Sequence, residues 1–95
     1  MLKIDVSKKS KKFLLSIPPK HSFQIDKKLF SLREDPFPSD SKKLSGYADY
    51  YRVDSGEYRI IYHLNSDGVV SILYIDLIGK RNDGEVYKKF SRSNN

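Results

Sequence analysis

Cysteine is absent from this 95-residue sequence, and so are long apolar runs. Without cysteine the chain can form neither disulfides nor thiolate metal sites, which suggests a reducing cytoplasm. The opening residues, MLKIDVSKKSKKF, hold no apolar stretch long enough for a signal peptide or a membrane span. The two histidines, His21 and His63, are too few for the usual metal sites. The sequence therefore predicts a cytoplasmic protein that works without a metal or other cofactor.

The composition is that of a globular protein, with 38% hydrophobic and 32% charged residues. A chain of this length suffices for one domain with a modest core, so we expect residues 1–95 to form a single domain. The net charge of +6 is concentrated in residues 1–30, where eight lysines face two aspartates. This excess suits an anionic partner such as nucleic acid, although a run like KKSKK is more often a solvated helix face.

Periodicity in the first half predicts one strand and two helices. Residues 2–6 alternate apolar and polar, as a short strand does, and Ser7 can cap the helix that follows. The proline pair at 18–19 ends that helix and opens a second one, which must stop before Pro36. Each helix has only a narrow apolar stripe, so both need a sheet to pack against.

The second half has a period of two. Strands are predicted at 49–54, 58–64 and 69–78, joined by the turns DSGE and NSDG, which is typical of an antiparallel meander. Residues 35–46 read as a loop, and GEVYKKF reads as a short C-terminal helix or extension. The whole order predicts an α+β fold: an N-terminal strand, a helical hairpin and a three-stranded meander in one sheet, with the helices on one face.

Strand alternation divides the side chains between the two faces of this sheet. The apolar residues of 58–64 would face the helices, which leaves polar side chains on the open face. These are Arg52, Asp54, Arg59 and His63. The third strand then delivers Lys80 and Arg81 at its end, and Tyr87 follows shortly after.

A cluster of arginines with a tyrosine can do chemistry without a metal. It can hold a phosphodiester and stabilise the added negative charge of a pentavalent transition state. With RNA the nucleophile is the substrate's own 2′-hydroxyl, so the protein needs only a base, an acid and cations. The simpler interpretation, that these residues have no chemical role, also stands. Arginines are common on the solvent face of any antiparallel sheet, and an aspartate at the position of Asp54 often shapes the turn that follows it.

Two segments, KKLSGYADYYRVDSGEYRIIYHL and VVSILYIDLIGKRNDGEVYKKF, resemble the C-terminal half of the RelE/ParE toxin superfamily. The shared pieces are KLSG, then YRV and G-x-YRIIY across a hairpin, and finally GKR…EVY. The N-terminal strand and helical hairpin suit the same fold, so the resemblance covers the whole chain. It implies the toxin of a bacterial type II toxin–antitoxin pair.

The RelE-like members of this superfamily imply a metal-independent endoribonuclease that cleaves mRNA in the ribosomal A site. The 2′-hydroxyl attacks the adjacent phosphate and leaves a 2′,3′-cyclic phosphate. Arg59 and Arg81 match arginines that stabilise the transition-state charge, and Tyr87 matches a tyrosine that stacks on the substrate base. Arg52 stands where RelE has a lysine and can also hold phosphate.

One position departs from the family pattern and concerns proton transfer. Lysine-rich RelE-like sites carry a basic residue where this chain has Asp54. An aspartate near arginines should have a lowered pKa and be a weak base. Lys80 and His63 are therefore further candidates for proton transfer, as is a group of the ribosome.

The resemblance also implies partners. RNA contacts are expected from lysines near the arginines, namely Lys42, Lys43 and Lys80. A neutralising antitoxin is expected in a hetero-oligomer with the toxin, and the ribosome and mRNA are expected as its targets. Two alternatives remain open: a ParE-like toxin that inhibits DNA gyrase by binding, and a degenerate toxin that only binds its antitoxin. The Arg81 and Tyr87 pair favours RNA cleavage over gyrase inhibition.

Overall fold

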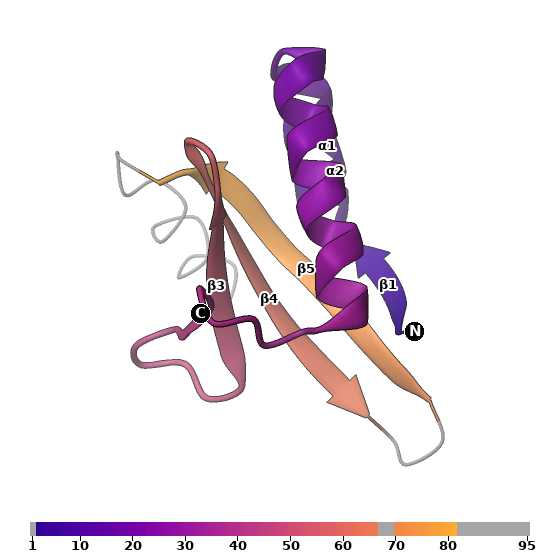
Figure 1. Ribbon diagram of the computed structural model, residues 1–95, viewed down its shortest axis with the longest axis vertical. Helices are drawn as coiled ribbons and strands as arrows, with labels where there is room; N and C mark the ends of the chain where they lie inside the picture. Colours follow the sequence, from indigo (N-terminus) through magenta and orange to yellow (C-terminus); the bar gives the residue numbers. More distant parts are fainter. Residues whose placement is uncertain (1, 67–69, 82–95) are drawn as a thin grey trace.

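A computed structural model of the chain describes residues 2–66 and 70–81. It contains two helices and five strands, drawn in Figure 1. In chain order they are β1 (Lys3–Val6), α1 (Lys8–Ser16), α2 (Pro19–Glu34), β2 (Lys42–Lys43), β3 (Tyr50–Ser55), β4 (Tyr58–Ser66) and β5 (Ser71–Lys80). The predicted C-terminal helix or extension lies outside the described residues. No helix in the described ranges is long and apolar enough to cross a membrane.

The strands form one mixed sheet in the order β1-β5-β4-β3-β2. β3, β4 and β5 are the predicted antiparallel meander, and β1 joins β5 in parallel. Both helices pack against one face of this sheet (Figure 1). The predicted α+β fold is thus confirmed. The loop expected over 35–46 needs one correction, since it contains β2, which pairs with β3 but is too short at two residues to show a strand period.

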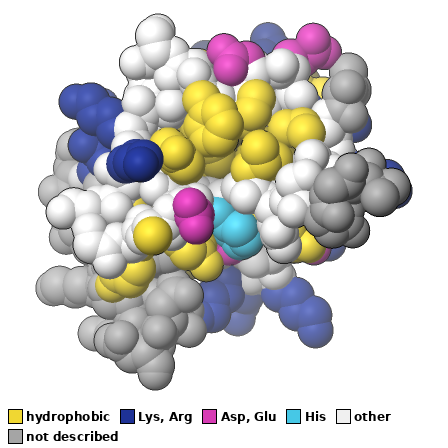
Figure 2. Space-filling view, turned by 90° about the horizontal axis from the view of Figure 1, so that it is seen from below, with side chains coloured by type: hydrophobic (Ala, Val, Ile, Leu, Met, Phe, Trp, Pro, Cys, Tyr) yellow, Lys and Arg dark blue, Asp and Glu magenta, His cyan; other side chains and the backbone are white. Residues whose placement is uncertain are grey.

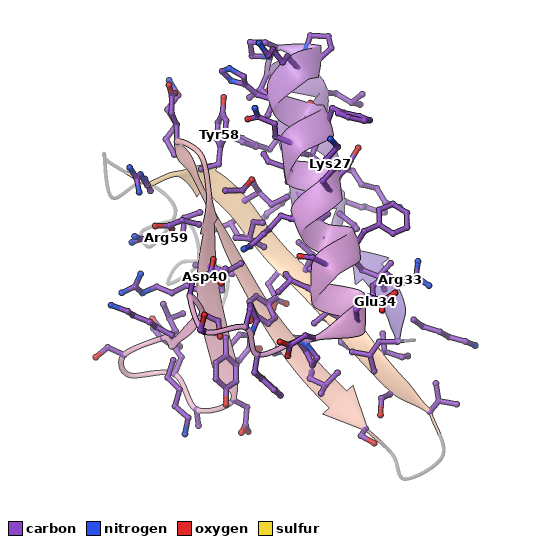
Figure 3. The ribbon with its side chains drawn as sticks, viewed as in Figure 1. Lys27, Arg33, Glu34, Asp40, Tyr58 and Arg59 are labelled. Atoms are coloured by element: carbon purple, nitrogen blue, oxygen red, sulfur yellow. The ribbon has the colours of Figure 1, made fainter. Side chains whose placement is uncertain are left out.

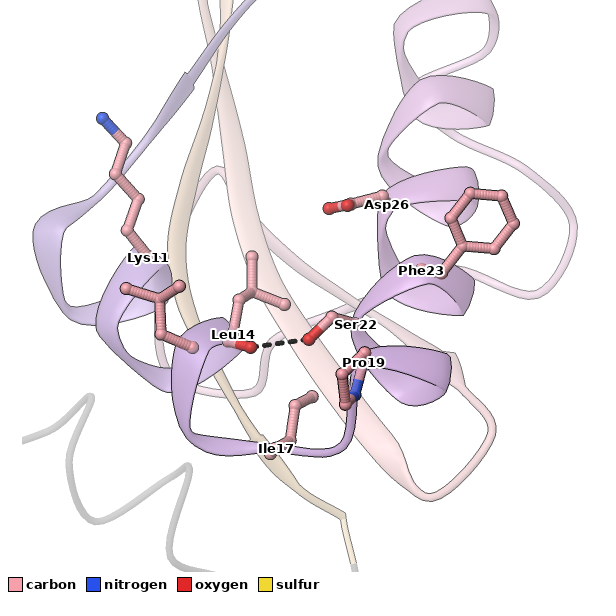
Figure 4. A pocket seen from close by; sticks show the side chains of 8 residues that line it. Lys11, Leu14, Ile17, Pro19, Ser22, Phe23 and Asp26 are labelled. Carbon is pink, nitrogen blue, oxygen red and sulfur yellow. Dashed lines mark hydrogen bonds between the residues drawn. The ribbon is translucent and has the colours of Figure 1, made fainter.

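Local signals explain the helical hairpin. Ser7 caps α1 by accepting a hydrogen bond from the backbone N–H of Ser10, and its own hydroxyl donates to the carbonyl of Asp76 in β5. Helix α2 begins at Pro19, where the missing N–H costs nothing. The Ser22 hydroxyl then donates to the Leu14 carbonyl at 2.6 Å and ties the two helices together (Figure 4). The hairpin is therefore anchored both internally and to the sheet.

The main core lies between the helices and the sheet. Ile25 and Leu32 of α2 are fully buried, as are Ile60 and Tyr62 of β4. The Tyr62 hydroxyl donates to the backbone carbonyl of Pro36 at 2.6 Å, so the buried polar atom has a partner. The predicted core face of β4 is confirmed by this arrangement.

A second, smaller apolar cluster lies on the opposite face, which we call the open face. It consists of Leu44, Ile61 and Leu77, with Tyr47 and Tyr50 packed against it. The register of β4 and β5 shifts here, because Ile61 pairs with Leu77 while Tyr62 pairs with Ile75. Asp76 is thus the extra residue of a β-bulge.

The outer side of the helical hairpin carries a hollow of about 560 Å³. Its lining is mostly apolar and includes Leu14, Ile17 and Phe23, with Lys11 and Asp26 at its margins (Figure 4). Leu15 also lines it, although its side chain is 88% exposed. Apolar surface left open on a small protein is typical of a surface that meets another protein.

Candidate active site

Arg59 and Asp54 form the centre of the candidate site on the open face. They lie directly opposite each other on β4 and β3, joined by the antiparallel register. Nε of Arg59 donates to Oδ1 of Asp54 at 2.8 Å, and an Nη atom donates to Oδ2 at 3.3 Å. Figure 3 shows Arg59 on the side of the hairpin away from α2, whereas Tyr58 lies between the hairpin and α2. Arg59, in the middle of β4, is therefore a cation whose position is fixed by a side-on contact with the Asp54 carboxylate.

Arg81 reaches the same carboxylate from the end of β5. Its Nη1 lies 3.4 Å from Oδ2 of Asp54, and its backbone N–H donates to the carbonyl of Glu57. The β4–β5 pairing thus brings two arginines that are 22 positions apart onto one aspartate. The arginine side chains are exposed by 17% at Arg59 and 45% at Arg81, so both can be reached from solvent. We call Asp54, Arg59 and Arg81 the arginine cluster.

Arg59 and Arg81 lower the pKa of Asp54 below its ordinary value of 3.8, first through the hydrogen bond from Arg59. Partial burial of the carboxylate acts in the opposite direction. The Asp54 carboxylate is therefore ionised at neutral pH and is a weak base. This agrees with the effect that the sequence predicts for an aspartate beside arginines.

The Asp54→Asn variant tests this pairing through the pH dependence of stability. A depressed pKa stabilises the folded protein above the unfolded value of about 3.8 and ceases to do so as pH falls through the lower folded value. The wild type should thus be more stable than the variant at pH 7, by less than about 1 kcal/mol because the pair is partly exposed. Urea denaturation should show this difference shrinking below pH 4. A gap that stays constant with pH would contradict the assignment.

The other predicted cations of β2 and β3 are divided between the two faces of the sheet. Arg52 of β3 lies two residues before Asp54 and shares its face, and Lys42 of β2 pairs with Arg52 in register. Lys43 pairs with Tyr51 and so projects toward the helix side. Arg52 and Lys42 therefore extend the basic surface beside the arginine cluster, and Lys43 does not.

Lys80 is the last residue of β5 and pairs with Tyr58, whose ring packs in the main core. Strand alternation places its side chain on the face opposite Arg59. Tyr87, the predicted stacking residue, lies outside the described residues. The structure thus brings together Arg52, Asp54, Arg59 and Arg81, and it separates Lys80 from them.

His63 lies on the open face as expected, but at a distance from the arginine cluster. It is four residues beyond Arg59 on β4, which corresponds to about 13 Å along a strand. Its Nδ1 shares a 2.7 Å hydrogen bond with a carboxylate oxygen of Asp76, and its ring stacks on Tyr74. Figure 2 shows the molecule from below, where a histidine side chain lies beside an acidic one and near hydrophobic ones, with lysines and arginines toward the edges.

The small apolar cluster around Ile61 separates His63 from the arginines. Burial raises the pKa of Asp76, and the hydrogen bond and charge of His63 oppose this. Asp76 lies on the open face with Tyr74, two residues before it, and the bulge places the adjacent Leu77 on that face as well. This partner of His63 was missed in the sequence. The only signal was the imperfect alternation of SILYIDLIGK.

The sequence allows Asp54 to be a turn residue or a weak base. The contact of Asp54 with both Arg59 and Arg81 depends on the β3–β4 register and on the residue at which β5 ends. Arg59 and Arg81 converge on the Asp54 carboxylate. Their guanidinium groups can bind a compact anion such as a phosphate group in place of that carboxylate.

Comparison with known proteins gives matches in structure and none in sequence. No family model matches the chain, and no curated protein matches it significantly. Among solved structures, an arginine double mutant of Escherichia coli toxin RelE in the free state matches with a TM-score of 0.76 at 24% identity, covering 97% of this chain and 96% of that one. RelE in the RelE–RelB complex of Pyrococcus horikoshii matches with a TM-score of 0.69 at 28% identity, covering 86% and 97%.

A YoeB/ParE toxin from Agrobacterium tumefaciens matches with a TM-score of 0.71 at 17% identity, covering 84% of this chain and 99% of that one. The fold is thus one shared by small bacterial and archaeal toxins. It is the fold of the RelE/ParE toxin superfamily, so the resemblance predicted from the sequence is confirmed. These matches support a toxin of the type II toxin–antitoxin kind, and structures of such toxins with RelB-type antitoxins are among them.

Proposed function

We propose that the chain is a single-domain toxin that cleaves mRNA in the ribosomal A site in the cytoplasm, without a metal. The observation that carries the proposal is the convergence of Arg59 and Arg81 on one point of the open face. Two guanidinium groups at that point would hold the scissile phosphate and stabilise the added charge of its transition state. Arg52 and Lys42 would hold neighbouring phosphates of the RNA, and Tyr87 would stack on a base.

The proposed reaction is an internal transfer. The 2′-oxygen of the RNA forms a bond to the adjacent phosphorus, and the bond from phosphorus to the 5′-oxygen of the next nucleotide breaks. The products are a 2′,3′-cyclic phosphate and a free 5′-hydroxyl. One proton leaves the 2′-hydroxyl and one arrives at the 5′-oxygen. The arginines supply charge for this step and no proton, because guanidinium stays protonated.

Proton transfer has no obvious carrier within the arginine cluster. Asp54 is a weak base and Lys80 projects from the other face. His63 lies four residues along β4 from Arg59, about 13 Å away. We therefore propose that the ribosome or the bound mRNA completes the acid–base set. This would make cleavage of free RNA slow and cleavage on the ribosome fast.

An antitoxin is the proposed protein partner. The solved complexes of RelE-type toxins with RelB-type antitoxins support this. The apolar hollow on the helical hairpin supports it as well, since such a surface on a small toxin suits contact with another protein.

Primer extension on cellular mRNA after brief induction of the chain tests the proposed function. Discrete cuts that keep the reading frame of translated genes are the expected result, and they should disappear when ribosomes are kept off the message. Transcripts that stay intact while growth stops would overturn the nuclease proposal. A gyrase supercoiling assay on the same protein would then test the ParE-like alternative, and unimpaired growth would point to a degenerate toxin.

A further inference from the structure

We propose that Asp54 is a built-in competitor for the substrate phosphate. Its carboxylate occupies the two guanidinium groups that would otherwise hold an RNA phosphate, and so it lowers the affinity of the open face for RNA. The inference rests on the proposed function only in taking RNA as the anion. It concerns binding strength, which can be measured apart from cleavage.

The geometry of the carboxylate is that of an anionic ligand. Oδ1 accepts from Nε of Arg59 at 2.8 Å, and Oδ2 accepts from Arg59 at 3.3 Å and from Arg81 at 3.4 Å. A phosphate uses two of its oxygens in the same way when it binds arginine side-on. The donors that face Asp54 are therefore those that a phosphate would use first.

The backbone of Asp54 is held in place by the sheet. It lies within β3, directly opposite Arg59, with paired residues on both sides of it in the ladder. Because the Asp54 carboxylate is attached to the same sheet as the arginines, its effective concentration there exceeds that of a free ligand. A phosphate must therefore displace the carboxylate to use the donors that face it.

The net charge of the arginine cluster also predicts that Asp54 weakens phosphate binding. Two arginines and one ionised aspartate sum to +1, whereas the arginines alone would sum to +2. A unit negative charge about 5 Å from a bound phosphate, at an effective dielectric between those of a protein surface and water, weakens binding by about tenfold. The effect should be largest at low salt, because partly exposed charges are screened.

The opposite role would be purely positional. If Asp54 served mainly to hold the arginines in place, its removal would loosen both side chains and weaken phosphate binding. The two roles therefore predict changes of opposite sign. For Arg81, the distance of 3.4 Å to the carboxylate and the 45% exposure of its side chain favour competition, since so long a contact positions a side chain poorly.

Binding of a short 2′-O-methyl RNA, which cannot be cleaved by 2′-hydroxyl attack, tests the proposal by fluorescence anisotropy without ribosomes. Asp54→Asn should bind this RNA about tenfold more tightly than the wild type at low salt, with a steeper dependence of log K on log salt. Asp54→Glu, which keeps the charge, should stay within about threefold of wild type. Asp26→Asn is the matched control, because Asp26 is an exposed aspartate of α2 that lines the hollow of the helical hairpin, on the helix side of the sheet. It should change affinity by less than the charge removal at Asp54.

An Asp54→Asn variant that binds the RNA equally or more weakly would overturn the proposal. Thermal denaturation of each variant shows whether it is folded at the assay temperature, and Asp54→Ser provides a second charge removal if the asparagine variant is not. The result is independent of cleavage. Tighter binding without ribosomal cuts would uphold this inference and reject the nuclease proposal, and cuts with unchanged binding would do the reverse.

Discussion

Replacing Arg59 with alanine should lower ribosome-dependent mRNA cleavage by about two to three orders of magnitude, the usual cost of removing one preorganised group that stabilises transition-state charge. Arg59 is the central member of the arginine cluster and makes the shortest contact in it. Single-turnover cleavage on programmed ribosomes measures the effect. The same change at Arg81 should act in the same direction, and both variants should fail to arrest growth when expressed.

The matched control for Arg59→Ala is Lys28→Ala. Lys28 also pairs with a carboxylate, at 2.7 Å from Asp40, but it lies on α2 and not on the open face. Its loss should leave cleavage nearly unchanged. Arg59→Lys should cleave at a rate between those of wild type and Arg59→Ala, because an ammonium group keeps the charge but cannot make the bidentate contact. Arg59→Ala and Arg81→Ala variants that are both folded and fully toxic would refute the catalytic assignment.

The second large effect concerns stability. Ile60→Ala should lower the free energy of unfolding by about 3–4 kcal/mol, since Ile60 is fully buried in the main core and its truncation leaves a cavity between the helices and the sheet. Urea denaturation with linear extrapolation measures the change.

Ile61→Ala is the matched comparison for Ile60→Ala. Ile61 is equally buried and adjacent in β4, but it belongs to the small cluster on the open face. That cluster has fewer buried members and lies near solvent, so its side chains can close part of the gap, and about 2 kcal/mol is expected. A loss at Ile61 as large as that at Ile60 would mean that the open-face cluster is as rigid as the main core.

The sequence was most informative where a pattern is local. The period of two in residues 49–64 correctly assigned Arg52, Asp54, Arg59 and His63 to the open face, because alternation is a property of each strand by itself. Proline positions located the helical hairpin for a similar reason. These predictions needed no knowledge of which strands are neighbours.

What the sequence did not reveal depends on pairing between distant segments. The short strand β2 exists only because it meets β3, and Asp76 reaches His63 only because β5 pairs with β4 in this register. In the same way, the contact of Asp54 with Arg81 requires the register of three strands together. Register is a result of tertiary packing, so a single strand's composition does not determine it.

The arrangement of strands by length has a consequence for how the protein behaves at high concentration. Within residues 2–66 and 70–81, the two outermost strands of the sheet are β1 and β2, with four and two residues, and the long strands β4 and β5 are interior. Unpaired backbone groups at a sheet edge invite another chain to add itself, and short edges with lysines discourage this. Lys3 on one edge and Lys42 and Lys43 on the other therefore make edge-to-edge aggregation of this sheet unfavourable.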